Sequence, residues 1–444
     1  MFKQVLPLSL IISLRFFGLF IVLPVISVYT LSLPGATPQI VGIVVGGYAI
    51  TQMIFQIPFG AMSDTLGRKG TIITGLLIFA IGSILCAIST DILTLLLGRF
   101  LQGAGAIGAV ITAMISDLVK EEQRPKAMAI MGGMIGMSFA LAMGFGPLIA
   151  GYSSIQTLFW ITAILPIISI YIIVKMVPDA PKVTHTYHNN SKYEFLLKNE
   201  IIKMNITNFL QKGLMTFAFM IIPIILTKTF GWTLADLWKV YVPALFAGIF
   251  SMGPAAMLAE KKGKYKEVLL AGIFLFGLSY FLIGTSSSQL SFLVGVIVFF
   301  IGFNVHEPIM QSLTVKYAKV NEKGKVLGVF NSFGYAGTFL GGLIGGFSLY
   351  EVDGSFMTSL SDISMIIVFV SIIWFLLILQ LPNPAKTKNA YIAIENMNEK
   401  NYTALDSLSG TEEWYINNTE KLLIVKYDNT KTSEESIREL LNLK

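Results

Sequence analysis

The sequence predicts an all-α membrane protein with twelve transmembrane helices in two pseudo-symmetric six-helix halves, followed by a small α+β domain. Three observations lead to this fold class. Hydrophobic residues make up 54% of the chain and charged residues only 13%, too few to cover a soluble protein of this size. The apolar residues fall into long runs up to about residue 381, and polar residues dominate from Asn383 onward. The two halves also share sequence motifs, described below.

A helix needs about twenty apolar residues to cross the hydrocarbon core of a membrane. Backbone hydrogen bonding leaves helices as the only structure for runs this long and apolar. The runs between polar breaks predict twelve spans, at about 5–29, 40–62, 71–89, 92–117, 126–151, 156–177, 203–227, 238–259, 267–285, 291–315, 325–348 and 362–381.

Lysine and arginine set the orientation of the spans. The loops that share a side with both termini hold nearly all of the loop cations, whereas the opposite loops hold only Lys228 and Lys239. Cytoplasmic loops carry this excess, so we expect a multi-pass protein of the cell inner membrane with both termini in the cytoplasm. The N-terminus continues directly into the first span and has no small-residue cleavage site, which indicates a helix and not a removable signal.

Composition also excludes several kinds of site. The single cysteine, Cys86, lies in an apolar run, so no internal disulfide or thiolate metal site is expected. The net charge of +6 follows from the membrane topology and does not indicate nucleic acid. No nucleophile–base pair or metal-ligand cluster is recognisable. We therefore expect no enzyme, no metal and no cofactor.

An internal repeat relates the two halves. Asp64 after the second span and Glu260 after the eighth are each followed three residues later by glycine and then a cation, and they lie 196 positions apart. Glu121-Glu-Gln-Arg124-Pro-Lys126 and Val320-Asn-Glu-Lys323-Gly-Lys325 match at an offset of 199. Duplicated halves of this kind bind substrate between them near the bilayer midplane. The predicted units are 1–177, a cytoplasmic linker at 178–202, 203–382 and a soluble domain at 390–444.

Three motifs resemble those of the major facilitator superfamily, and the resemblance covers essentially the whole chain. The segment between Ser13 and Pro24, together with the tail, resembles one branch whose members carry a ferredoxin-like C-terminal domain. The motifs are Gly60-x-x-x-Asp64-x-x-Gly67-Arg68-Lys69, Arg99-x-x-Gln102-Gly103-x-Gly105, and Gly144-x-Gly146-Pro147-x-x-x-Gly151, the last similar to the antiporter signature of drug:proton exporters.

The first motif predicts a cytoplasmic gate. Asp64 and Arg68 lie at the water interface, and Asp117 ends the fourth span at the same level, so the three side chains form a plausible cluster. The resemblance implies that this cluster latches the cytoplasmic side shut in the outward-facing state. The alternative is that Arg68 and Lys69 serve only as topology anchors.

Ionisable groups inside spans are costly and therefore point to function. They are Arg15, Arg99, Lys212, His306 and Glu307. Glu307 is the only acid well away from both surfaces, and a carboxylate can couple to protons if desolvation and a cation alternate around it. Lys212, Arg15 or Arg99 is the candidate partner. The alternative is a permanent ion pair that only fixes helix packing.

Further residues are assigned to the cavity or to helix packing. Gln102 shares a helix face with Arg99, for which we weigh proton transfer against snorkelling to the surface. Asn304 is a candidate cavity residue, and His306 is expected to be a hydrogen-bonded packing residue. Since three buried cations face one acid, we expect an anionic or amphiphilic solute. Glycines and Pro147 on the fifth span favour a smooth, bent surface for sliding between halves.

The sequence thus predicts a monomeric, proton-coupled efflux antiporter of a small molecule in the lipid bilayer. A nutrient-uptake symporter and a membrane sensor built on a transporter fold remain alternatives.

The tail predicts strands at 391–395, 414–417 and 422–427 and helices at 399–407 and 434–441. This β-α-β-β-α order resembles a ferredoxin-like module that lacks its final strand. A regulatory or bracing role and a passive appendage both fit this pattern.

Overall fold

The computed structural model describes residues 2–180, 185–187, 194–319, 322–352, 355–358, 360–394 and 402–441. Within these residues, twelve helical stretches are long and apolar enough to cross a membrane, as many as the sequence predicts. A small α+β unit follows the last of them. The predicted fold class is therefore confirmed.

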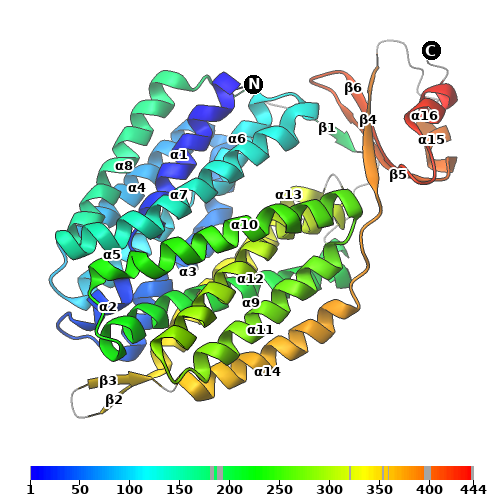
Figure 1. Ribbon diagram of the computed structural model, residues 1–444. Helices are drawn as coiled ribbons and strands as arrows, with labels where there is room; N and C mark the ends of the chain where they lie inside the picture. Colours follow the sequence, from blue (N-terminus) through cyan, green and yellow to red (C-terminus); the bar gives the residue numbers. More distant parts are fainter. Residues whose placement is uncertain are drawn as a thin grey trace.

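The N-terminal half contains α1–α8 and the C-terminal half contains α9–α14 (Figure 1). The elements of the N-terminal half are α1 (Phe2–Phe20), α2 (Ile26–Leu31), α3 (Pro38–Thr65), α4 (Arg68–Ala87), α5 (Ile92–Ala104), α6 (Gly108–Leu118), η1 (Glu121–Gln123), α7 (Arg124–Tyr152) and α8 (Ile155–Met176). Those of the C-terminal half are η2 (Glu194–Leu197), α9 (Asn199–Ile224), η3 (Ile225–Thr229), η4 (Leu234–Leu237), α10 (Trp238–Lys262), α11 (Tyr265–Gly284), α12 (Gln289–Lys316), α13 (Lys323–Phe347), the hairpin β2 (Leu349–Val352) and β3 (Ser355–Thr358), and α14 (Leu360–Leu379).

Packing between spans repeats from one half to the other. In the N-terminal half α1 packs on α7, α3 on α5, and α4 on both α5 and α8. The spans six positions later make the same contacts, since α9 packs on α13, α10 on α12, and α11 on both α12 and α14. This correspondence is the structural counterpart of the motif repeat in the sequence.

Two predicted spans are interrupted helices. The first bends at 21–25 between α1 and α2, where Pro24 cannot donate a backbone hydrogen bond. The fourth breaks between α5 and α6 at Gly105, whose φ of −73° and ψ of 57° are not helical. A Cβ atom at Gly105 would lie 2.4 Å from the carbonyl oxygen of Gly75 on α4, so glycine permits this close approach.

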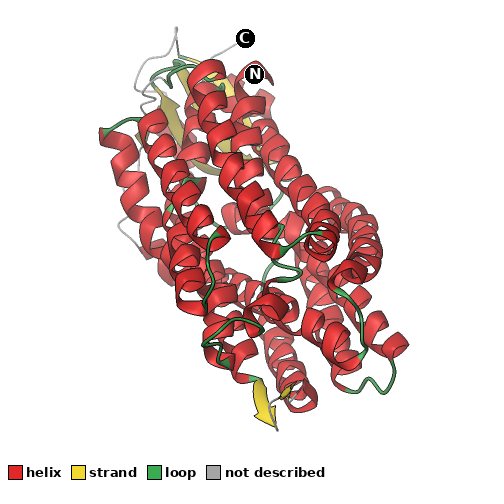
Figure 2. Cartoon of the chain, turned by 90° about the vertical axis from the view of Figure 1, so that its left-hand side faces the viewer, coloured by secondary structure: helices red, strands yellow, loops and turns green. Residues whose placement is uncertain are grey.

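The two halves meet at one end of the molecule and separate at the other. Both termini lie at one end, here called the tail side, and the β2–β3 hairpin lies at the opposite end, the far side (Figures 1 and 2). On the far side, a Cβ at Gly42 of α3 would lie 2.4 Å from the carbonyl oxygen of Gly342 on α13, and one at Gly151 of α7 would lie 2.4 Å from Ala235. The halves are closely packed there.

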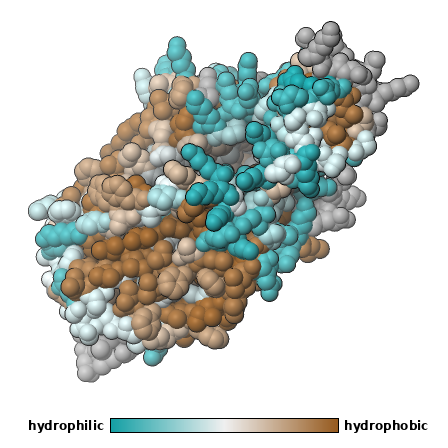
Figure 3. All heavy atoms as spheres, turned by 45° about the vertical axis from the view of Figure 1, so that its right-hand side comes forward, coloured by the Kyte–Doolittle hydropathy of each residue, from teal (hydrophilic) through white to brown (hydrophobic). Residues whose placement is uncertain are grey.

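The tail-side ends of the same interface helices are not packed. Among the described residues, nothing outside the adjoining turns of the same helix lies within 4 Å of the position that a Cβ would take at Gly60 on α3, Gly132 and Gly136 on α7, or Gly328 on α13. The interface between the halves is therefore closed on the far side and open on the tail side. Figure 3 shows apolar side chains over much of the membrane part and polar side chains gathered towards the tail.

The tail forms a sheet backed by two short helices. Its own elements are β4 (Thr387–Ala393), α15 (Tyr402–Ser407), β5 (Thr411–Asn417), β6 (Leu422–Asp428) and α16 (Glu434–Leu440). This matches the predicted β-α-β-β-α order, although predicted positions 395 and 399–401 lie outside the described residues. The fourth strand is β1 (His185–Tyr187), from the linker between the halves, and the sheet order is β1-β5-β6-β4.

Candidate functional site

An ion pair inside the membrane part joins α12 to α9. The Glu307 carboxylate lies 2.9 and 3.1 Å from Lys212 Nζ and accepts a 3.1 Å hydrogen bond from Gln211. The Glu307 side chain is 42% exposed and that of Lys212 is 24% exposed. Lys212 Nζ lies 5.1 Å from the ring centroid of Phe303, and this ring contacts Phe139 of the N-terminal half at 6.3 Å, so the pair faces the space between the halves. Of the three predicted cations, Lys212 is the one that pairs with Glu307.

Arg15 on α1 forms a polar cluster that crosses between the halves. Its guanidinium donates a 3.2 Å hydrogen bond to Gln52 on α3, and Gln52 donates a 2.6 Å bond to the Tyr335 hydroxyl on α13. The ring of Phe79 lies 5.4 Å from the guanidinium carbon. Arg15 is almost fully buried, and its Nε and Nη1 atoms have no hydrogen-bond partner among the described residues. No described carboxylate pairs with it.

Arg99 lies inside the N-terminal half and does not reach Glu307. It donates to Gln102 at 2.8 Å and to the Val44 carbonyl oxygen at 3.2 Å, and its guanidinium carbon lies 4.7 Å from the ring centroid of Tyr48. Gln102 in turn donates a 3.0 Å bond to Ser83 on α4. The predicted Arg99–Gln102 pair therefore exists, fully buried, and its hydrogen bonds join α3, α4 and α5.

Two other predicted residues serve packing contacts. Asn304 donates a 2.9 Å bond to the Phe300 carbonyl oxygen and lies against Gly248 on α10. The His306 ring nitrogen Nε2 lies 2.7 Å from the Leu269 carbonyl oxygen, and the ring makes edge contacts with Phe276 and Trp374, which stack on each other. His306 thus faces α11 and α14, away from Lys212, although it follows directly before Glu307.

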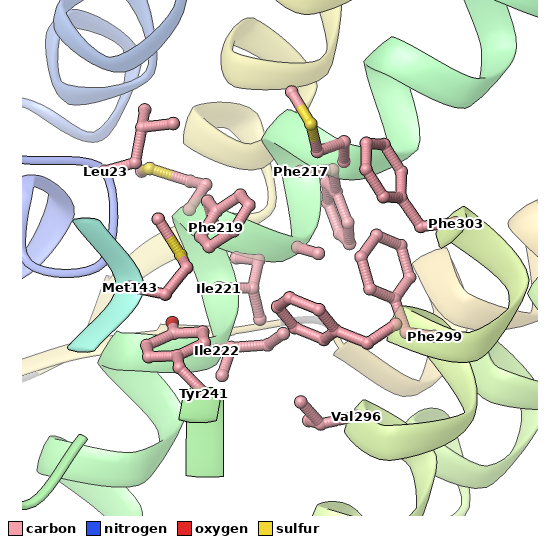
Figure 4. Packing of buried hydrophobic residues seen from close by; sticks show 14 of the residues in the cluster. Leu23, Met143, Phe217, Phe219, Ile221, Ile222, Tyr241, Val296, Phe299 and Phe303 are labelled. Atoms are coloured by element: carbon pink, nitrogen blue, oxygen red, sulfur yellow. The ribbon is translucent and has the colours of Figure 1, made fainter. Parts of the chain in front are cut away.

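Aromatic and aliphatic side chains close the far end of the space between the halves. Figure 4 shows Leu23 and Met143 of the N-terminal half beside Phe219 and Tyr241 of the C-terminal half. Phe139 on α7 also makes ring contacts across the interface, at 6.1 Å from Phe219 and 6.3 Å from Phe303. These contacts form an apolar floor beneath the Glu307 pair.

The structure brings together the predicted gate cluster. Arg68 lies 2.9 Å from Asp64 and 3.0 Å from Asp117, and Lys69 lies 3.1 Å from Asp179. Gly67 begins α4 with a φ of 83°, a conformation that favours glycine. Arg68, Asp64, Asp117 and Lys69 belong to the N-terminal half, and Asp179 lies at the start of the linker. The cluster is thus assembled while the tail side is open, and a Cβ at Gly60 beside it would meet open space.

The third motif lies at the far-side interface. A Cβ at Gly146 would lie 2.2 Å from the carbonyl oxygen of Ile21, and one at Gly144 would lie 3.4 Å from Val242 on α10. Gly151 contacts Ala235 of the C-terminal half, as described above. Pro147 is buried within α7. The small residues of this motif therefore permit close contact at the end of α7 where the halves meet.

Sequence reasoning did not identify Gln52, Gln211 or Tyr335. Gln52 and Gln211 are amides within otherwise apolar spans, and this is a detectable signal because polar groups are rarely placed in the membrane without a partner. Tyr335 lies in the glycine-rich eleventh span, and nothing in the sequence distinguishes it from a packing tyrosine.

Comparisons with known proteins agree with this architecture. The family model described as Major Facilitator Superfamily matches residues 8–342 and again 206–396. The inner membrane transport protein YajR of Escherichia coli (strain K12) is 32% identical over 450 residues, which cover 98% of this chain and 96% of that protein. The quinolone resistance protein NorA of Staphylococcus aureus is 26% identical over 371 residues, covering 79% and 90%.

Solved structures share the fold at low sequence identity. The crystal structure of a D-xylose-proton symporter aligns with a TM-score of 0.67 and 13% identity, covering 85% of this chain and 98% of the other.

The twelve spans, the repeated halves and these matches define a multi-pass membrane transporter. The chain belongs to the major facilitator superfamily, whose members carry small molecules.

Proposed function

We propose that this protein is a proton-coupled efflux antiporter that exports a small anionic or amphiphilic solute by alternating access. The observation that carries the proposal is the Glu307–Lys212 pair, an acid and a cation on facing helices with partly exposed side chains in the open interface. Charged groups are rarely kept within the membrane without a function. The apolar floor below the pair separates it from the far side.

Proton coupling requires a group whose affinity for protons differs between the two access states. A nearby cation favours an ionised carboxylate, whereas desolvation favours the protonated form. In this structure Glu307 is bonded to Lys212 and Gln211, which stabilise its charge. We infer that movement of the halves weakens these bonds in the other state, so that Glu307 takes up a proton there.

The proposed orientation places the tail side in the cytoplasm of a cell inner membrane. Lysine and arginine are concentrated in the loops on this side, and the relative YajR is named an inner membrane protein. The structure then represents an inward-facing state.

Export is supported by the third motif and by a relative. Gly144 and Gly151 lie against Val242 and Ala235 of the C-terminal half at the far-side interface, which must open and close during transport. The relative NorA is named a quinolone resistance protein.

Arg15 supports an anionic substrate group. Two of its nitrogen atoms have no hydrogen-bond partner among the described residues. Arg15 donates to the Gln52 side chain, which in turn donates to the Tyr335 hydroxyl of the opposite half. Separation of Tyr335 from Gln52 would uncover a cation with free donor capacity. Lys212 is neutralised by Glu307 and Arg99 is enclosed, so of the three predicted cations Arg15 is the one that we assign to the substrate.

Transport in inside-out vesicles tests both direction and coupling. With an imposed acidic interior, an antiporter accumulates the anionic probe carboxyfluorescein, whereas a symporter releases it. We expect Glu307→Gln to abolish the proton-driven accumulation while exchange of labelled for unlabelled probe continues. The matched control is Glu412→Gln, which breaks an acid–lysine pair of 2.8 Å to Lys426 in the tail, outside the membrane.

Proton-driven accumulation that survives in Glu307→Gln would exclude Glu307 from coupling. Accumulation driven only by an alkaline interior would reverse the proposed direction. A preference for the cationic probe ethidium over carboxyfluorescein would contradict the proposed substrate class.

A further inference from the structure

The tail is attached to the C-terminal half at the open end of the interface. It follows α14 directly in the chain. The Asn383 side chain accepts a 2.8 Å hydrogen bond from the Lys266 backbone and donates a 3.1 Å bond to the Glu267 carboxylate, both at the start of α11. The Tyr317 hydroxyl at the end of α12 donates to the Pro382 carbonyl oxygen. The base of the tail is thus fixed to three elements of one half.

The same tail also contacts the N-terminal half, at Glu121 between α6 and α7. The Tyr415 hydroxyl and the Asn417 amide each donate a 3.0 Å hydrogen bond to the Glu121 carboxylate. The Glu420 carboxylate accepts a 2.9 Å bond from the Glu121 backbone N–H. Hydrogen bonds to charged groups are shorter and stronger than neutral ones. The Glu121 side chain is only 10% exposed.

Tyr415 keeps the proton that this contact needs. Burial, together with the nearby Glu121 carboxylate, raises the pKa of Tyr415 well above its usual range. The hydroxyl therefore stays a donor at every physiological pH.

The linker between the halves provides a second contact with the tail. Strand β1 pairs antiparallel with β5, and Tyr187 lies opposite Tyr415 in the register. An added strand of this kind is held by backbone hydrogen bonds. The strand that bonds Glu121 through its side chains therefore also holds the linker through its backbone.

We propose that Tyr415, Asn417, Glu420 and the edge of β5 opposite β6 form a docking surface. Its partners are Glu121 and the linker strand β1, and it is occupied only while the tail side is open. The tail moves with the C-terminal half, whereas Glu121 belongs to the rim of the N-terminal half. When the halves rock, the two sides of the contact move relative to each other. Hydrogen bonds tolerate only a few tenths of an ångström, so this contact must break on closure.

A contact that exists in one state shifts the equilibrium towards that state. The docked tail therefore favours the state open to the tail side and slows the return to the closed one. This inference rests on the alternating access of the proposed function, but not on the substrate or on proton coupling.

Distance measurements on the full chain test the docking surface. The buried Cys86 is replaced by Ala, and spin labels are placed through Leu66→Cys and Lys262→Cys, at exposed positions on opposite rims of the tail side. Pulsed electron spin resonance then reports the open and closed populations. We expect Tyr415→Phe combined with Asn417→Ala to raise the ratio of closed to open roughly tenfold, since about 1.4 kcal/mol corresponds to a factor of ten.

The matched control is Tyr427→Phe. It removes a hydroxyl from the same sheet, on β6 in the tail core near Glu434 and Glu435 of α16, and is expected to leave the ratio unchanged. A second variant, Thr186→Pro with Tyr187→Pro, tests the linker strand. Neighbouring residues of a strand point their N–H groups to opposite sides, so one of the two prolines must remove a bond to β5. It should also raise the closed population.

Two distance populations that do not respond to either variant would overturn the docking proposal and leave alternating access intact. An equal response to Tyr427→Phe would also overturn it, because the effect would then reflect tail stability. A single distance at every pH and with every probe would instead contradict the alternating access on which the proposed function depends.

Discussion

The two halves have the same helix packing but different charged contacts. At the tail-side surface, Arg68 beside Asp64 bonds Asp117 near the end of α6. In the C-terminal half Glu260, the counterpart of Asp64, lies 3.8 Å from Lys316, a cation in the place of Asp117. Inside the membrane part, Glu307 pairs with a lysine in the C-terminal half, whereas Arg15 in the N-terminal half has only neutral partners among the described residues.

This difference suggests that the two duplicated halves have different roles in transport. Under the proposed function, the C-terminal half holds the proton and the N-terminal half holds the charge of the substrate. The hydrogen bond from Gln52 to Tyr335 connects the two halves directly at the arginine cluster. Movement of the halves can therefore link the Glu307 pair to Arg15, because the bond between Gln52 and Tyr335 exists only when the halves are close.

The largest effect expected besides loss of Glu307 is at Lys212. Lys212→Gln leaves the acid without its cation, and we expect proton-driven accumulation of carboxyfluorescein to fall at least tenfold, because breaking an ion pair of this kind costs about 1.4 kcal/mol or more. Lys212→Arg keeps the charge and should retain most activity. Equal activity of the Gln and Arg variants would show that the cation plays no part in coupling.

Arg15→Gln tests the other side of the comparison. Loss of a charged donor should raise the KM for carboxyfluorescein about tenfold, since a hydrogen bond to a charged group contributes about 1.5–3 kcal/mol. Proton-driven transport at saturating probe should remain. Initial rates at a series of probe concentrations measure this effect. A change in the maximal rate alone, with an unchanged KM, would indicate a structural role for Arg15.

Arg99→Gln should affect stability and not substrate affinity. The substitution removes the hydrogen bonds to Gln102 and Val44 and the contact with Tyr48, within a fully buried site. We expect a loss of about 2 kcal/mol in the free energy of unfolding and a lower thermal midpoint in detergent. The protein that remains folded should keep its KM for the probe. A raised KM at normal stability would place Arg99 in the transport pathway.

The smallest effect is expected at His306. Its ring bonds a backbone carbonyl and makes edge contacts with two aromatic rings, so His306→Gln should lower stability by under about 1 kcal/mol, as is typical of polar contacts between membrane helices. The pH profile of transport should not change. Loss of proton drive in this variant would show that the acid of the C-terminal half does not act alone.

Much of the fold could be predicted because the membrane restricts the possible structures. Each of the twelve apolar runs had to be a helix. The loop cations predicted the orientation of the spans, and the motif repeat predicted two six-helix halves. The breaks at 21–25 and at Gly105 could not be predicted with certainty, since proline and glycine are tolerated in membrane helices when neighbours satisfy the backbone.

The candidate site was predicted in part. Glu307 and Lys212 were identifiable because a charged side chain is costly to place within a span and therefore usually has a function. The same argument could not distinguish Arg15 from Arg99, because the difference depends on which carbonyl groups and rings surround each guanidinium. The linker strand β1 was also beyond prediction, since three residues are too few to show the alternating pattern of a strand.

The central claim is that Glu307 carries the transported proton, and infrared difference spectroscopy tests it most directly. Spectra of the purified protein between alkaline and acidic buffers should contain a carbonyl stretch from a newly protonated carboxyl group. The account predicts that the component of this band due to Glu307 is missing in Glu307→Gln and remains in the tail control Glu412→Gln. A band that is unchanged in Glu307→Gln would contradict it.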